Sequence, residues 1–198
     1  MSQSALTAKL DRPVDEARDH VLGPRDAEIT VLEYGSYACP YCRAVNERIV
    51  ELRHEFGDRL RYVFRHYPLP GSDIAMRAAR LVEHAQNNEH FWRAHVTLMT
   101  RSHTLIDDDL DEAAAGLGLP SSDPRHAAAA DLQARAHVDE DVRSAHASRV
   151  AITPTFFING RRYDGAYDVD SLEAAIRAAR WEVRSGSAHV AARSASPV

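Results

Sequence analysis

Hydrophobic and polar positions divide the chain into a strand-rich beginning, a helical middle and a mixed end. Residues 29–34 form a short β-branched and aromatic run that stops at Gly35, a pattern typical of a buried strand. Apolar positions then recur at helical spacing as far as Gly57, and a second apolar run follows over residues 60–64. This order predicts two parallel strands joined by a right-handed helical crossover.

The middle of the chain, residues 71–150, has a helical pattern. Alanine is dense there, and apolar residues recur every three or four positions, which predicts a series of amphipathic helices. Asp123 followed by Pro124 predicts the start of the last helix. The predicted inward-facing stripes are Ile74, Ala78, Leu81, Val82 and Ala85; Phe91, His95, Leu98 and Met99; Leu110, Ala113, Ala114 and Leu117; and Val138, Val142 and Ala145. We interpret this segment as one inserted all-helical lobe.

The strand pattern returns near the end of the chain, at residues 151–158. Asn159-Gly160 is a strong signal for a two-residue hairpin turn, and residues 161–163 then predict a fourth strand. A final helix follows, with Asp170 as its predicted N-cap. The predicted fold class is therefore α/β, with a central sheet of about four strands in the order βαβ then ββα.

These patterns also predict the organisation of the chain into parts. We expect a loose stretch over residues 1–12 and a turn over residues 19–24. The predicted parts are an N-terminal arm over 1–24, a discontinuous sheet domain over 25–70 and 151–184, a helical insert over 71–150, and a disordered tail over 185–198.

Composition and charge exclude two classes of partner. The net charge of −5 gives no basic footprint for a nucleic acid. Acidic and basic residues interrupt every apolar run in residues 1–28, and a membrane span would need about 20 apolar residues. We therefore expect no membrane partner and no secretory signal, which predicts a reducing, cytoplasmic location.

The candidate chemistry lies in the two cysteines of the chain, within Cys39-Pro40-Tyr41-Cys42. Proline suits the first turn of a helix, so Cys39 is predicted to be the N-cap and Cys42 to lie one turn deeper. The helix dipole and free N–H groups then favour the Cys39 thiolate, and such sites lower a thiol pKa from about 8.5 to roughly 3.5–7.5. We predict that Cys39 is the nucleophile and that Cys42 resolves the mixed disulfide.

Glu33 lies in the predicted strand before the cysteines, where a carboxylate is costly without a role or a partner. It can serve as the proton acceptor for Cys42, or strand alternation can simply point it to solvent. The residues alone leave both interpretations open.

A zinc site is the main competing chemistry. His90 and His95 could in principle join the cysteines, but they follow much later than in structural zinc motifs. His95 also falls on the apolar face of its helix, which favours a core histidine. We therefore expect no metal and no other cofactor.

Taken together, these motifs over residues 14–182 resemble the DsbA-like thiol–disulfide oxidoreductases of the thioredoxin-fold superfamily. In that family an acid on the strand precedes Cys-x-x-Cys, a helical insert follows, and a cis-proline loop comes last. The resemblance implies the fold above and assigns catalytic roles to Glu33, Cys39, Cys42 and Pro154. The Pro-Tyr pair between the cysteines is the one usual in glutaredoxins.

The predicted topology places Pro154 near the cysteines, independently of the family resemblance. If its strand pairs antiparallel with the first strand, residues Thr153 and Pro154 lie against Cys39. A cis bond there would turn the chain sharply and leave the Thr153 backbone free to pair with an extended substrate. Pro40, Tyr41 and Thr153 are therefore the predicted substrate-binding residues.

The predicted function is thiol–disulfide exchange with protein or small-molecule thiols, recycled by an unidentified reductant or oxidant. The alternatives are a glutathione- or mycothiol-linked reductase or transferase of the kappa type, and a redox-inactive binding module. The two cysteines together with Glu33 and Pro154 favour the first.

Overall fold

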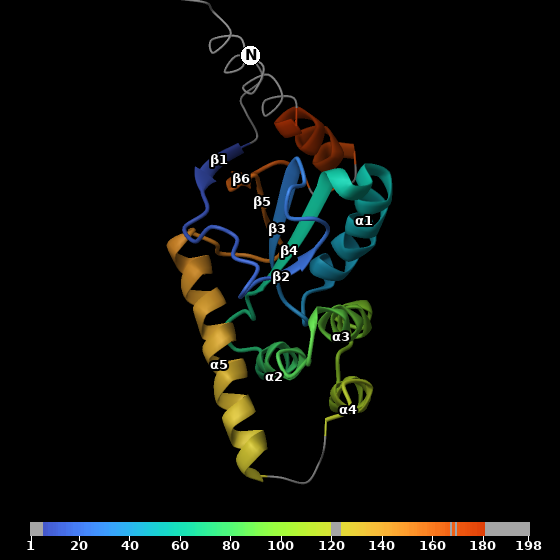
Figure 1. Cartoon of the computed structure of the whole chain (residues 1–198), viewed down its shortest axis with the longest axis vertical. Helices are drawn as coiled ribbons and strands as arrows, with labels where there is room; N and C mark the ends of the chain where they lie inside the picture. The colour runs from blue at the N-terminus through green and yellow to red at the C-terminus, as the bar shows by residue number, and fades with distance from the viewer. Residues whose placement is uncertain (1–5, 120–123, 167, 169, 181–198) are drawn as a thin grey trace, which may run out of the picture.

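A six-stranded mixed sheet forms the centre of the protein in a computed structural model that describes residues 6–119, 124–166, 168 and 170–180 (Figure 1). The strand order is β1-β6-β5-β3-β4-β2. The strands are β1 (Leu6–Lys9), β2 (His20–Leu22), β3 (Ile29–Gly35), β4 (Leu60–His66), β5 (Thr155–Ile158) and β6 (Arg161–Tyr163).

The centre of the sheet has the predicted topology. Strand β3 pairs parallel with β4 and antiparallel with β5, and Tyr34 is the register partner of Thr155. The beginning of β5 therefore lies beside the end of β3. Asn159 and Gly160 both have positive φ, 49° and 74°, as a two-residue turn of the hairpin type requires, and β5 and β6 pair across them.

The N-terminal prediction was wrong in two places. The stretch expected to be loose contains β1, which pairs with β6, and the expected turn contains β2, which pairs with β4. Both strands are short, of four and three residues. Their stability comes from partners far along the chain, so the local pattern carried no signal for them.

A buried arginine ties the segment between β1 and β2 to the sheet. The Arg65 guanidinium donates to both carboxylate oxygens of Asp19, at 2.8 and 2.9 Å, and to the carbonyl oxygens of Arg12 and Pro13. Neither Arg65 nor Asp19 exposes its side chain. This ion pair and its backbone contacts hold residues 12–19 against β4.

The helices follow the predicted order. They are α1 (Pro40–Phe56), α2 (Asp73–Val82), α3 (Asn88–Thr100), α4 (Asp107–Gly116), α5 (Pro124–Ala147) and a final helix over residues 170–180, with a 3-10 turn, η1 (Gly57–Arg59), after α1. The final helix is capped by Asp168, whose carboxylate accepts from the Ser171 N–H at 2.9 Å, and not by Asp170. Asp123, the predicted cap of α5, lies outside the described residues.

The helices cover the two faces of the sheet. Alternation along β3 places Ile29 and Val31 in the larger core, with α1 and the final helix, and Leu32 and Tyr34 in a second core against the end of α5. Helices α2, α3 and α4 lie beyond the carboxyl ends of β3 and β4 (Figure 1).

The larger core includes residues from both the sheet and the helical lobe. Because the two segments share this core, the division of the chain into separate domains stays a prediction. The predicted disordered tail lies outside the described residues. Among the described helices, none combines the length and apolar content that a bilayer crossing requires.

Candidate thiol active site

The connection from β3 to α1 places the two cysteines as predicted. Cys39 is the N-cap of α1 in an extended conformation, and Pro40 is the first helical residue. Both thiols are free; Cys39 keeps 5% of its surface exposed, whereas Cys42 is fully buried. Tyr41 between them is 72% exposed. Of the two cysteines, Cys39 is therefore the one closer to the surface.

Hydrogen bonds to the sulfur stabilise the thiolate form of Cys39. The Cys42 thiol lowers the pKa of Cys39 most, and the backbone N–H groups of Cys42 and Tyr41 lower it further, against the opposing effect of burial. The resulting pKa is about 5. Cys39 is consequently ionised at neutral pH, as a nucleophile must be.

Cys42 has the opposite character. Burial raises its pKa well above the usual value, and the hydrogen bond to Cys39 and the charge of Glu33 raise it further. Cys42 is therefore a thiol at neutral pH and must lose its proton before it can attack. The two sulfurs thus occupy clearly different protonation states in the same site.

Glu33 lies beneath the cysteines, on the face of β3 that packs against α1, and only 1% of its surface is exposed. The interpretation that it points to solvent is therefore wrong. Burial raises the pKa of Glu33 to about 8, although hydrogen bonds from Tyr62 and Cys42 oppose the rise. Its Oε1 atom has no hydrogen-bond partner among the described residues. Glu33 can thus hold or release a proton near neutral pH.

Gly35 makes room for this carboxylate. A Cβ atom at position 35 would lie 2.7 Å from Glu33 Oε1 and would also overlap the Phe64 ring. The glycine that ends the strand pattern therefore has a packing role at the site.

The Thr153–Pro154 peptide bond is cis, and the loop lies against the first cysteine. The Thr153 carbonyl oxygen is 3.3 Å from Cys39 Sγ, and both Thr153 and Pro154 are buried. The predicted proximity of this loop to the thiols is therefore confirmed. Exposed Ile152, at 56%, lies immediately before it.

Two residues of the site were not predicted from the sequence. The Tyr62 hydroxyl donates to Glu33 Oε2 at 2.7 Å, and the Ser102 hydroxyl donates to the Cys39 carbonyl at 3.0 Å. Tyr62 sits in a strand predicted to flank that of Glu33, so its hydroxyl offered a weak signal. Ser102 follows α3 and gave no signal, but its bond shows that the helical lobe reaches the thiols.

His95 is a core residue, as predicted. Its ring is 1% exposed, its Nδ1 lies 3.0 Å from the Tyr37 hydroxyl, and burial lowers its pKa to about 3. It therefore stays neutral and bonds within the core.

Comparison with known proteins gives several relatives by sequence that are named Na(+)/H(+) antiporters. The chain is 54% identical over 167 residues to the Na(+)/H(+) antiporter NhaA of Nitrosospira multiformis, and 41% identical over 170 residues to NhaA 1 of Salinispora arenicola. Each match covers 84% of this chain but 27% and 26% of the relative. The chain thus spans about a quarter of the length of these relatives.

Solved structures and a family model point to the fold. BdbD of Bacillus subtilis superposes with a TM-score of 0.67 at 20% identity, covering 90% of this chain and 99% of that one. For alpha-DsbA1 of Wolbachia pipientis the TM-score is 0.70 at 19% identity, covering 89% and 97%. A family model described as Thioredoxin matches residues 15–178. Since that model spans most of the chain, the chain belongs to the thioredoxin family, and these structural neighbours share its fold.

Proposed function

We propose that the protein is a thiol–disulfide oxidoreductase that works by dithiol exchange. The Cys39 thiolate attacks a substrate disulfide, forming a mixed disulfide and releasing the first substrate thiolate. Cys42 loses its proton and attacks Cys39 Sγ, which forms the Cys39–Cys42 disulfide and releases the second thiolate. The substrate gains two electrons and the protein loses two; the reverse sequence oxidises a dithiol.

The observation that carries this proposal is the contrast between the two sulfurs. Cys39, which keeps 5% of its surface exposed, is ionised, and the fully buried Cys42 is protonated and donates a hydrogen bond to it. A site built for transfer of one thiolate would not need the second sulfur one helical turn below. The arrangement therefore favours dithiol exchange over the kappa-type transferase and over the redox-inactive module.

The exposed surface around Cys39 suits an extended polypeptide. Tyr41, between the cysteines, and Ile152, just before Thr153, are large apolar side chains that remain 72% and 56% exposed. The Thr153 backbone lies before the start of β5 and is outside the sheet ladder. We propose that a substrate strand pairs with this backbone while Pro40 and Tyr41 contact its side chains.

The pH dependence of Cys39 alkylation tests the proposed nucleophile. With a pKa of about 5, the rate of reaction with iodoacetamide is expected to be nearly constant between about pH 6 and pH 7. It should fall about tenfold per pH unit below pH 5, because only the thiolate reacts. Mass spectrometry of the modified chain gives the rate. An inflection near pH 8.5 would show an ordinary thiol and remove the basis of the proposal.

Replacing Glu33 with glutamine tests the proton acceptor. Glutamine keeps the size of the side chain but cannot take a proton from Cys42, and general-base catalysis typically contributes about 100- to 10,000-fold. We expect resolution of a preformed Cys39 mixed disulfide to slow by about 100-fold, with little change in the first attack. Stopped-flow fluorescence separates the two steps. Unchanged resolution in a folded variant would assign Glu33 a structural role only.

The direction of electron flow follows from the compartment. A stabilised Cys39 thiolate favours the reduced protein and makes its disulfide more oxidising. In the cytoplasmic setting that we propose, the pair would be kept mostly reduced and would act as a reductase or an isomerase. The recycling partner would then be a cellular reductant.

The named relatives support a second, narrower function. Proteins called Na(+)/H(+) antiporters contain a segment that is up to 54% identical to this chain. We propose that the thiols handled by this protein include those of a membrane transporter of that class. The trapping experiment described in the Discussion tests this assignment.

A further inference from the structure

Four ionisable side chains converge where the edge of the sheet meets the helical lobe. They are His20 on β2, His66 at the end of β4, Glu83 at the end of α2 and His137 on α5. His20 Nε2 and His66 Nε2 lie 2.7 and 2.6 Å from Glu83 Oε1, and His137 Nδ1 lies 2.9 Å from Oε2. One carboxylate thus faces three imidazole nitrogens.

Three of these side chains offer ligand atoms that are close enough for one ion. The atoms of His20, Glu83 and His137 all lie within 4.8 Å of one another. The rings of His20 and His137 lie side by side, with centroids 5.2 Å apart. Two imidazoles and one carboxylate are the three protein ligands in some catalytic zinc sites, where water or substrate takes the fourth position.

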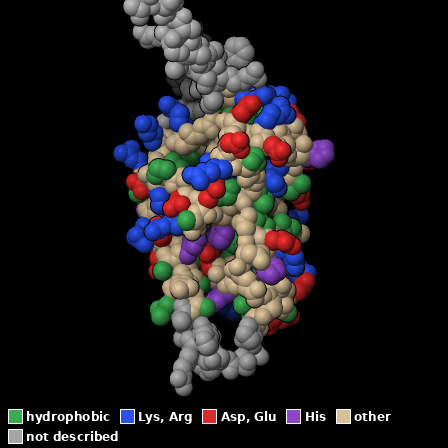
Figure 2. Space-filling model, viewed as in Figure 1, with side chains coloured by type: hydrophobic (Ala, Val, Ile, Leu, Met, Phe, Trp, Pro, Cys, Tyr) green, Lys and Arg blue, Asp and Glu red, His purple; other side chains and the backbone are tan. Residues whose placement is uncertain are grey.

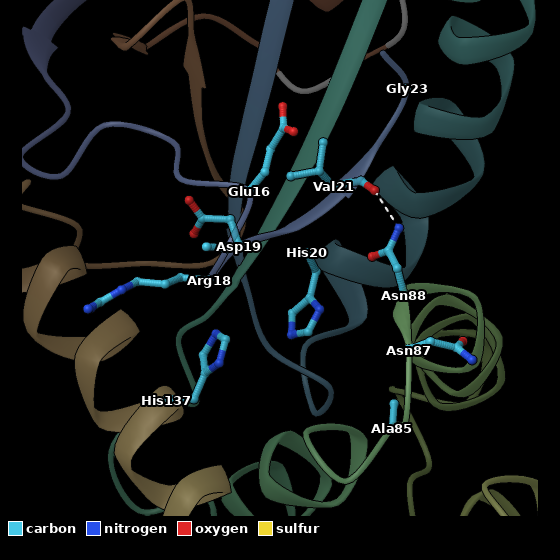
Figure 3. Close-up of a pocket in the computed structure, with 11 residues that line it drawn as sticks. Glu16, Arg18, Asp19, His20, Val21, Gly23, Ala85, Asn87, Asn88 and His137 are labelled. Atoms are coloured by element: carbon cyan, nitrogen blue, oxygen red, sulfur yellow. Dashed lines mark hydrogen bonds between the residues drawn. The ribbon is translucent and has the colours of Figure 1, made fainter. Parts of the chain in front are cut away.

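The cluster is open on one side and closed on the other. A cavity of about 540 Å³ is lined by His20 and His137, whose side chains are 17% and 24% exposed. Figure 3 shows both rings projecting into the space between β2 and α5. Histidine side chains also reach the surface in Figure 2, on the face seen in Figure 1. An ion from solvent can therefore reach the two histidines, whose ring nitrogens lie 2.7 and 2.9 Å from the Glu83 carboxylate.

Groups around the cluster hold the ligands in place. His66 is 1% exposed and reaches Glu83 from the closed side, while its buried Nδ1 has no hydrogen-bond partner among the described residues. His137 Nε2 faces Asp141 Oδ2 at 3.8 Å. Asp141 is fixed by Arg12 at 2.7 Å and by the His66 N–H at 3.0 Å. Ligating histidines commonly have a carboxylate near the other ring nitrogen, which orients the ring.

We propose that His20 Nε2, His137 Nδ1 and a carboxylate oxygen of Glu83 bind one divalent ion of the zinc class, with a fourth position open to the cavity. His66 is a positioning residue that donates to Glu83. Nitrogen donors select borderline transition ions over Mg²⁺ or Ca²⁺, which prefer oxygen ligands. The ion would join the edge strand β2 to helices α2 and α5, so its binding would stabilise the folded chain.

Zinc binding by the full chain tests this site. The chain should carry Cys39→Ser and Cys42→Ser, so that thiolates do not compete for the ion. We expect one equivalent of Zn²⁺ in calorimetric titration and a higher melting temperature with Zn²⁺ present, since an ion that binds only the folded state stabilises it. Co²⁺ should give the visible absorption of a four-coordinate site.

Matched variants in the same background locate the ion. His137→Ala and Glu83→Gln should each weaken Zn²⁺ binding at least tenfold and remove the rise in melting temperature. His54→Ala is the control, because His54 is exposed on α1, outside the cluster. This variant should leave the Zn²⁺ affinity and the rise in melting temperature unchanged. Circular dichroism without metal checks that each variant folds. Absence of stoichiometric binding, or equal binding by the folded Glu83→Gln variant and the control, would overturn the proposal.

Discussion

Replacing Cys39 with serine is expected to reduce catalysed insulin-disulfide reduction to the uncatalysed background. The reaction needs a thiolate at the helix N-terminus, and hydrogen bonds lower the pKa of Cys39 there to about 5. A serine hydroxyl is not ionised there and cannot form the mixed disulfide. Cys42 cannot substitute for it, because Cys42 is fully buried and remains protonated.

The measurement is the turbidity that develops as insulin chains separate in the presence of dithiothreitol. Circular dichroism and the melting temperature of the variant should match those of the parent chain, since serine is nearly the size of cysteine. Catalysis by a folded Cys39→Ser variant would exclude the dithiol mechanism.

Replacing Cys42 with serine should stop the reaction halfway. Cys39 can still attack a disulfide, but no second sulfur lies within the site to displace the substrate. The mixed disulfide should therefore accumulate as a stable adduct, visible by non-reducing electrophoresis and released by dithiothreitol. The Cys39→Ser/Cys42→Ser chain is the control and should give no adduct. A Cys42→Ser chain that forms none either would remove the resolving role of Cys42.

The same adducts identify the substrates. Peptides of a sodium–proton antiporter among the trapped proteins would support the narrower function proposed above. A set of adducts drawn only from other proteins would exclude that function and leave the general exchange activity standing.

The sequence pattern predicted those elements of the fold that are specified by residues close together in the chain. The β3 run, the Asn159-Gly160 turn and the amphipathic stripes of α2 to α4 all carry their signals within a few residues. Strands β1 and β2 carry none, because their order depends on ladders with β6 and β4 and on the buried Arg65. The pattern of residues along the chain does not reveal which distant segments pair as strands.

The residues of the candidate site fall into the same two groups, those predictable from the sequence and those brought in only by the fold. Cys39 and Cys42 form a compact motif, and Pro154 followed from strand order. Tyr62, 29 residues from Glu33, and Ser102, 63 residues from Cys39, reach the site only through the fold. The histidine cluster has no spacing motif at all, since even His20 and Glu83 are 63 residues apart.

The short strands β1 and β2 also affect whether copies of the chain can pair through the edges of the sheet. Strand β2 pairs with residues 62–64 of β4, and β1 pairs with β6, so these ladder positions of the inner strands are occupied. A chain trimmed at residue 25, where the folded part was expected to begin, would present the seven-residue β4 as a bare border. Such borders recruit strands from other molecules. We therefore expect β1 and β2 to limit self-association of the folded chain.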